Sequence, residues 1–200
     1  MLSRGAARSI GYSSLVSIGN ECDVTAGELV GLMVDDPDTD IILLFLEAVR
    51  DPELLARNAR RAFAAGKPVI AYKLGRSEVG RELALSHSGA IAGPDESVDS
   101  FFRHNGVLRA DMLETLLELP PLVLKARPTI TRRVAVLTTT GGGAGMVVDR
   151  LGTFGIELIP PSPALRSRMA EFKIDLGDRR VIDLTMAGTA KGVYGAALEV

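Results

Sequence analysis

Two uninterrupted apolar segments on either side of an amphipathic helix pattern limit the fold of this chain more than any other feature. Residues 41–46 (IILLFL) and 68–72 (PVIAY) lack the alternation of half-exposed strands and are typical of strands covered on both faces. Between them, residues 52–65 begin with proline and place their apolar side chains on one stripe, and Gly66 follows. A strand, helix and strand in this order imply parallel pairing with a right-handed crossover. We therefore expect an α/β fold with mostly parallel sheets.

The same alternation continues along the rest of the chain. We expect further strands at residues 14–18, 134–138, 156–159 and 181–184, and further helices at 27–34, 96–104, 111–119 and 146–154. Thr25 is a candidate N-cap for the first of these helices. Prolines and basic residues at 120–132 indicate a connection between two α/β units. The predicted division is a first domain at 1–122, a linker at 123–132 and a second domain at 133–200, the second with few strands.

Composition excludes several classes of function. The net charge of −2 offers no excess of positive charge for nucleic acid or an anionic membrane surface. No apolar run is long enough to span a bilayer, and no signal peptide is recognisable, so a cytoplasmic location is expected. One cysteine and two histidines, far apart, give no metal-ligand spacing. Aromatic residues make up 4% and tryptophan is absent, which disfavours flavin or base stacking.

The segment GRSEVGRELALSHSGAIAG, residues 75–93, places a histidine among small residues. Ser86, Ser88 and Gly89 surround His87 and allow a close approach of backbone N–H groups to an anion. A neutral imidazole is available near neutral pH and could accept a phosphoryl group. Judged from these residues alone, a loop histidine that hydrogen-bonds only to backbone is the favoured interpretation.

Glu47 directly follows the first apolar strand, at the strand end where open α/β sheets place their sites. A carboxylate there could hold the N–H of an imidazole and stabilise positive charge on the ring. Judged from the pattern alone, an exposed glutamate paired with Arg50 or Lys73 is the favoured interpretation.

A second candidate anion site is the glycine-rich stretch after the strand at 134–138. Gly142, Gly143, Ala144 and Gly145 would present backbone N–H groups at the start of a helix. No Lys-Ser or Lys-Thr follows, so the stretch is not a Walker A loop. A tight turn between strand and helix explains the glycines equally well.

Several segments, in order, resemble the NDP-forming acyl-CoA synthetases, which include ADP-forming acetyl-CoA synthetase and succinyl-CoA synthetase. SHSGAIAG is similar to their SH-T-G-A-x-A-G segment, although Ser88 replaces the commoner threonine. GYSSLVSIGNECDV, DDPDTDIILLFLEAVRD and KPVIAYKLGRSEVG resemble further family segments, with Ala48 in place of the usual glycine. The glycine-rich stretch resembles T-x-x-G-G-x-G, and Ile182-Asp183-Leu184-Thr185 resembles P-V-D-L-T.

The resemblance implies tandem flavodoxin-like ligase domains in which His87 carries a phosphoryl group between acyl phosphate and nucleotide. It implies that Glu47 supports the histidine and that residues 142–145 bind phosphate. It also implies that CoA, ATP or ADP, and Mg²⁺ bind to CoA-binding and ATP-grasp domains or subunits outside this chain, and that the substrate is a small carboxylic acid.

Two other functions compete with this one. A synthetase-like region can serve as a sensor module of a protein acyltransferase, and a flavodoxin-like domain can bind a flavin or small anion. By comparison with the family, we expect the first sheet to lack its opening strand and the second to be incomplete. Such a piece should be inactive as an isolated acid-thiol ligase. Open sheet edges could pair with another copy, which predicts a homodimer.

Overall fold

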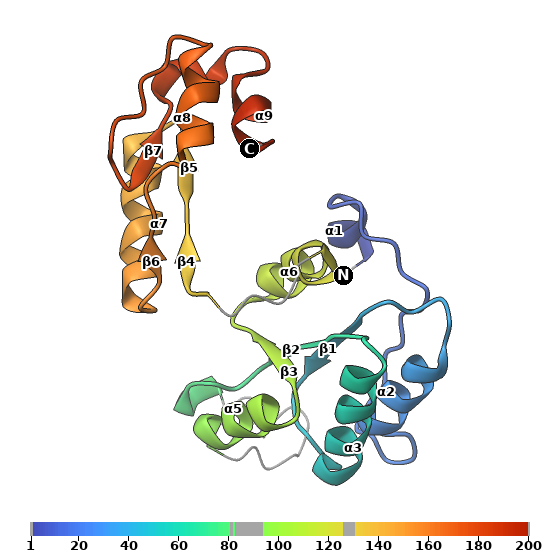
Figure 1. Cartoon of the computed structure of the whole chain (residues 1–200). Coiled ribbons are helices and arrows are strands. Elements are labelled where there is room, and N and C mark those ends of the chain that lie inside the picture. Colours follow the sequence, from blue (N-terminus) through green and yellow to red (C-terminus); the bar gives the residue numbers. More distant parts are fainter. Residues whose placement is uncertain (1, 81, 83–93, 126–130, 200) are drawn as a thin grey trace. The chain divides into compact units, whose positions relative to one another are not determined.

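The computed structural model describes residues 2–80, 82, 94–125 and 131–199 (Figure 1). The chain divides into two units, Met1–Ala126 and Arg127–Val200, which we call unit 1 and unit 2. Among the described residues, no helix is long and apolar enough to cross a membrane. Both units pair their strands in parallel, as the apolar pattern predicts, so the α/β fold class is confirmed.

Unit 1 is a three-stranded sheet with helices on both faces. Its elements are α1 (Leu2–Ala6), α2 (Ala26–Asp35), β1 (Ile42–Leu46), α3 (Pro52–Ala64), β2 (Val69–Lys73), α5 (Asp95–His104), β3 (Val107–Ala110) and α6 (Leu113–Lys125). The strands lie in the order β1-β2-β3. The register pairs Leu46 with Lys73 and Tyr72 with Ala110, so all three strands end at the same edge.

The two faces of this sheet are covered unequally. On one face α2, α3 and α5 pack against alternate strand residues, and the core centres on Ile42, Leu55 and Phe102, each at most 1% exposed (Figure 1). On the other face α6 covers Ile70 and Ala110, while Phe45 at the β1 side remains 43% exposed. The expectation that residues 41–46 are covered on both faces therefore holds fully for one face only, because α6 packs mainly on β2 and β3.

Helices α2 and α3 pack closely because two glycines of α2 face α3. A Cβ on Gly27 would lie 2.8 Å from the backbone nitrogen of Leu55, so only glycine allows this approach. The Asn58 amide is 6% exposed and donates to the carbonyl oxygen of Gly27 at 2.8 Å. This hydrogen bond satisfies a polar group inside the helix interface.

The cap predicted at Thr25 is present, and the structure adds a second cap at Asp51. Thr25 accepts a hydrogen bond from the Glu28 N–H, and the Glu28 side chain accepts one from the Thr25 N–H, which forms a capping box. Asp51 caps α3 by accepting from the Leu54 N–H at 2.9 Å, with Pro52 in the first turn. The sequence therefore fixes where both helices begin.

Residues 14–18, expected as a strand, form none in this described stretch. The side chains of Leu15 and Val16 are 52% and 48% exposed, and the segment has no backbone ladder with β1. An apolar run makes a strand only where a neighbouring strand edge pairs with its backbone. The prediction for this segment was wrong.

Two other differences lie at the end of unit 1. Strand β3 was missed because Arg109 interrupts its short apolar pattern. Helix α6 continues to Lys125 through Pro120 and Pro121, past the predicted end at Leu119 and into the predicted linker. Pro120 is buried, so packing on the sheet offsets the backbone hydrogen bonds that the prolines remove.

Unit 2 holds two short parallel pairs of strands. Its elements are β4 (Arg133–Val134), β5 (Val136–Thr138), α7 (Gly141–Thr153), β6 (Glu157–Leu158), α8 (Pro163–Ala170), β7 (Val181–Asp183), the 3₁₀ helix η1 (Thr185–Thr189) and α9 (Val193–Leu198). Strand β4 pairs with β6, and β5 pairs with β7. The core of this unit gathers around Met169, Ile182 and Leu184, each at most 1% exposed.

We expect Phe102→Ala to destabilise unit 1 far more than Phe63→Ala. Phe102 is fully buried under the sheet, and truncation of such a side chain costs about 3–5 kcal/mol. Phe63 lies on α3 but is 73% exposed, so its loss should change the free energy of unfolding by roughly 0.5 kcal/mol or less. Urea denaturation of both variants measures the difference. Equal losses would mean that Phe102 is not part of the core.

Candidate functional site

The carboxyl ends of β1 and β2 bring the first candidate residue to a charged edge of the sheet. The N–H of Leu74 donates to the carbonyl oxygen of Leu46 at 2.9 Å, so the segments that follow β1 and β2 leave the sheet side by side. Glu47 follows Leu46 directly and is partly exposed. The side chain of Lys73, at the end of β2, interacts electrostatically with Glu47. The predicted position of Glu47 at a strand end is thus observed.

Lys73 is the most buried cation at this edge among the described residues. It is 3% exposed, and its Nζ donates to the carbonyl oxygen of Leu74 at 2.5 Å. Burial lowers the pKa of Lys73, and Arg109 lowers it further, while attraction to Asp95 and Glu47 acts in the opposite direction. The charge of the ammonium group is therefore offset in part by Glu47, which follows β1, and by Asp95, the first residue of α5.

A cavity of about 580 Å³ opens beside Glu47. Its walls come from residues 15–21 and 43–48, with Ala26, Leu29 and Met33 of α2. Most of the lining is apolar, and Glu47 and Glu21 supply carboxylates. Asn20 and Glu21 have positive φ angles of 53° and 48°, and the Glu21 carboxylate accepts from the Ala26 N–H at 2.9 Å. The sharp turn before α2 therefore shapes one wall of this cavity.

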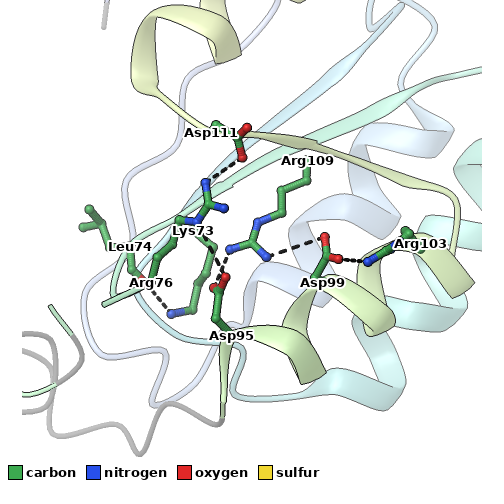
Figure 2. Close-up of polar contacts among 8 residues, drawn as sticks. All are labelled: Lys73, Leu74, Arg76, Asp95, Asp99, Arg103, Arg109 and Asp111. Atoms are coloured by element: carbon green, nitrogen blue, oxygen red, sulfur yellow. Dashed lines mark hydrogen bonds and ion pairs between the residues drawn. The ribbon is translucent and has the colours of Figure 1, made fainter. Parts of the chain in front are cut away.

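Several ion pairs surround Asp95 where β3 ends and α5 begins (Figure 2). Asp95 binds Arg109 at 2.5 Å and lies 3.6 Å from Arg76, and Arg76 binds Asp111 at 2.6 Å. Arg109 also lies 3.6 Å from Asp99, which in turn pairs with Arg103. The sequence pattern did not reveal this cluster, because its members are spread over α5, β3 and the segments that follow β2 and β3. The only signal was that charged residues follow the ends of apolar strands.

Four predicted site residues, the histidine and three neighbours, lie outside the described part of the chain. These are Ser86, His87, Ser88 and Gly89. Their distance from Glu47 stays a prediction. The described residues on either side, Arg76 and Asp95, both belong to the charged edge that also contains Lys73.

The glycine-rich stretch of unit 2 is the first turn of α7, whereas a loop was expected. Thr140 caps the helix: its Oγ1 accepts from the Gly143 N–H at 3.3 Å. Gly142, Gly143 and Gly145 are exposed, and Ala144 is buried. The first N–H groups of a helix have no partner within the helix, so this exposed turn could bind an anion.

A carboxylate already lies near this turn. Asp183 ends β7, and its Oδ2 is 3.9 Å from the position of a Cβ on Gly141. Its other oxygen accepts from the Thr185 N–H at 2.8 Å. A negative charge near a helix N-terminus is favourable, and it also competes with a phosphate for the same N–H groups. Sequence reasoning assigned no role to Asp183.

Among the residues described, no group of three or more histidine, cysteine, aspartate or glutamate side chains could hold a metal ion. Neither candidate site thus offers a protein ligand set for Mg²⁺ within this part of the chain.

The pH dependence of stability tests the burial of Lys73. Its pKa is lowered from the ordinary value of 10.5, so between the two values the unfolded chain binds more protons, and the stability that depends on Lys73 rises with pH. We therefore expect the free energy of unfolding of Lys73→Met, relative to that of the wild type, to be higher near pH 7 than near pH 10. Urea denaturation at both pH values measures this. The exposed Lys191→Met is the control and should show no such change.

Two neighbouring glycines test the geometry of the α7 turn. In Gly143→Ala the new Cβ would lie 2.7 Å from Thr140 Oγ1 and displace the cap, a loss of about 1 kcal/mol. Gly142→Ala meets nothing within 4 Å and should stabilise the helix by up to about 1 kcal/mol. Denaturation of the two variants gives the comparison. If both were stabilising, Thr140 would not cap this helix.

Comparison with known proteins shows the family to which the chain belongs. The family described as succinyl-CoA ligase like flavodoxin domain matches residues 1–123. An ADP-forming acetate–CoA ligase of Methanocaldococcus jannaschii is 34% identical over 151 residues, which make up 75% of this chain and 21% of that enzyme. A trans-feruloyl-CoA synthase, FCS1, from an unknown prokaryotic organism is 36% identical over 169 residues, 82% of this chain and 24% of that protein.

A solved structure of a related enzyme supports the same family. The dinucleotide forming acetyl-coenzyme A synthetase 1 of Ca. Korarchaeum cryptofilum, in complex with phosphate and ADP, matches with a TM-score of 0.79 and 30% identity. The match covers 92% of this chain and 40% of that one. The chain thus spans less than half of each of these relatives. It belongs to the NDP-forming acyl-CoA synthetase family, in the succinyl-CoA-ligase-like flavodoxin region.

Proposed function

We propose that this chain supplies the phosphoryl-transfer part of an NDP-forming acyl-CoA synthetase, with His87 as the phosphorylated residue and Glu47 as its supporting carboxylate. The observation that carries the proposal is the position of Glu47. It stands at the carboxyl end of β1, beside the end of β2, from which the chain runs on to the segment containing His87. Parallel sheets of this kind place their reacting groups at that edge.

The relatives support assignment of this region to phosphoryl transfer, not to selection of the acid. One is named for acetate and another for a feruloyl group, yet they are similarly related to this chain, at 34% and 36% identity. A region shared by enzymes with such different acyl groups is suited to the step that those enzymes have in common. The acyl group of the native protein would then be chosen by other features.

In the proposed reaction an acyl-CoA and phosphate first give an acyl phosphate and free CoA. A ring nitrogen of neutral His87 attacks phosphorus, and the bond from phosphorus to the acyl oxygen breaks, so the carboxylate leaves with the electron pair. Glu47 accepts a hydrogen bond from the other ring N–H and offsets the positive charge that develops on the ring. The terminal oxygen of a nucleoside diphosphate then attacks phosphorus, and the nitrogen–phosphorus bond breaks to restore the imidazole.

The other components are assigned by the same proposal. CoA, the nucleotide and Mg²⁺ bind to CoA-binding and ATP-grasp domains or subunits outside this chain. The start of α7, residues 142–145, provides a further phosphate contact through the first N–H groups of the helix, although Thr140 already accepts from the N–H groups of Gly143 and Ala144. The 200-residue chain alone should therefore form no acyl-CoA from acid, CoA and nucleoside triphosphate.

The two histidines of the chain allow a sharp test of His87. In the native protein that contains this chain, nucleoside triphosphate labelled on the γ-phosphate should give an acid-labile, base-stable label on His87. His87→Asn should abolish the label and the overall turnover. His104→Asn, on the exposed end of α5, should leave both unchanged. Label that persists in His87→Asn would refute the assignment.

Glu47→Gln should fold normally and slow phosphoryl transfer, because it keeps the shape of the side chain and removes its charge. Supporting acid–base groups contribute about 10²–10⁴-fold. The matched control is Glu53→Gln, an exposed glutamate in the first turn of α3. Rapid-quench measurement of labelling compares the two. Equal rates in both variants would exclude the supporting role.

A further inference from the structure

The cluster around Asp95 joins two points that are far apart along the chain. Arg76 lies shortly after β2, and Asp95 is the first residue of α5. Arg76 Nε lies 3.6 Å from one carboxylate oxygen of Asp95, and Arg109 of β3 binds the other oxygen at 2.5 Å. Arg76 also donates to Asp111, just after β3, at 2.6 Å (Figure 2). The chain therefore leaves β2 shortly before Arg76 and enters α5 at Asp95, and these two points lie close together.

The ion pair of Arg109 with Asp95 is more buried than the pair of Arg76 with Asp111. The side chain of Arg109 is 10% exposed and that of Asp95 is 24% exposed, so their pair is shielded from water and holds the start of α5 on β3. The side chains of Arg76 and Asp111 are 46% and 61% exposed. Within the described residues Arg109 Nε is a buried donor with no hydrogen-bond partner, so Arg109 depends on its contacts with Asp95 and Asp99.

An exposed arginine contributes little to stability when it forms one ion pair, typically less than about 1 kcal/mol. Arg76 instead spans two carboxylates from two segments, Asp95 and Asp111. A planar guanidinium with several donors can bind two such groups in fixed directions, which a lysine ammonium on its flexible stem does less well. The arrangement fits a residue that defines geometry better than one that adds stability.

We propose that Arg76 is a positioning residue for the phosphoryl acceptor: by binding Asp95 and Asp111 it holds together the two ends of the segment 77–94, in which His87 lies. This inference rests on the proposed function of His87. Loop-closure entropy grows only slowly with loop length, so a contact that joins the two ends of a long segment still restricts the segment as a whole. Phosphoryl transfer is sensitive to such placement, because an error of about 1 Å can cost about 10²-fold in rate.

The test compares two arginines in the native protein that contains this chain. Arg76→Gln removes the contact, Arg76→Lys keeps the charge, and Arg61→Gln is the control. Arg61 has the same side-chain exposure of 46% and pairs with Asp35 on the α2–α3 side of unit 1. The measurements are the rate of His87 labelling, the KM for nucleotide, the thermal midpoint, and hydrogen exchange in peptides from residues 77–93.

We expect Arg76→Gln to slow labelling by about 10²-fold with little change in KM, to speed hydrogen exchange in that segment, and to match Arg61→Gln in thermal midpoint. Arg76→Lys should recover part of the rate, and the recovered part should shrink at high salt, where exposed charges are screened. Arg61→Gln should resemble the wild type in labelling and exchange.

Two results would overturn the inference. One is equal labelling and exchange in Arg76→Gln and Arg61→Gln. The other is a loss of labelling that follows a lower thermal midpoint and that Arg76→Lys does not restore. If the wild type itself carries no label on His87, the proposed function fails, and the exchange comparison, which needs no activity, then decides whether Arg76 holds the segment.

Discussion

The parallel pairing of β1 with β2 is the constraint on which the rest of unit 1 depends. A parallel pair needs a crossover, so α3 must cross one face of the sheet, and the apolar stripe of α3 then has to meet the strands. The same pairing brings every strand end to one edge. Glu47, Lys73 and Asp111 arrive there because each follows or ends a buried strand. The charged edge is therefore a consequence of topology before any of its side chains interact.

At this edge the most deeply buried charged side chains lie near side chains of opposite charge. Lys73 is almost fully buried, and its lowered pKa reflects the cost of taking an ammonium out of water. Asp95 and Glu47 offset part of that cost, and Asp95 also binds Arg109. Asp95 also lies 3.6 Å from Arg76, so it compensates three cations. A change at this one carboxylate would leave both Lys73 and Arg109 poorly compensated, which makes it the electrostatic centre of the edge.

The sequence predicted those parts of the fold in which local pattern and tertiary packing agree. The apolar segments 41–46 and 68–72, the helix after Asp51 and the cap at Thr25 all follow from residues close together in the chain. Strand β3 could not be predicted, since Arg109 breaks its pattern, and the partners Asp95 and Asp99 make that arginine tolerable there. Residues 14–18 failed in the opposite way: their local pattern favours a strand, but no strand edge pairs with them in the described structure.

The candidate site shows the same limit. The position of Glu47 could be predicted because a strand end is a local feature, and the family resemblance marks His87 because its motif is local as well. The ion pairs of Arg76 could not be predicted, since they join residues that only the folded sheet brings together. The two units also differ in the charge that they offer to a phosphate. The turn at α7 has its N–H groups and the nearby Asp183, whereas the edge of unit 1 has the cations Lys73, Arg76 and Arg109 together with the carboxylates of Glu47, Asp95, Asp99 and Asp111. Each place therefore combines groups that attract a phosphate with carboxylates that repel it, and a phosphoryl group held at either place would compete with those carboxylates for the same donors.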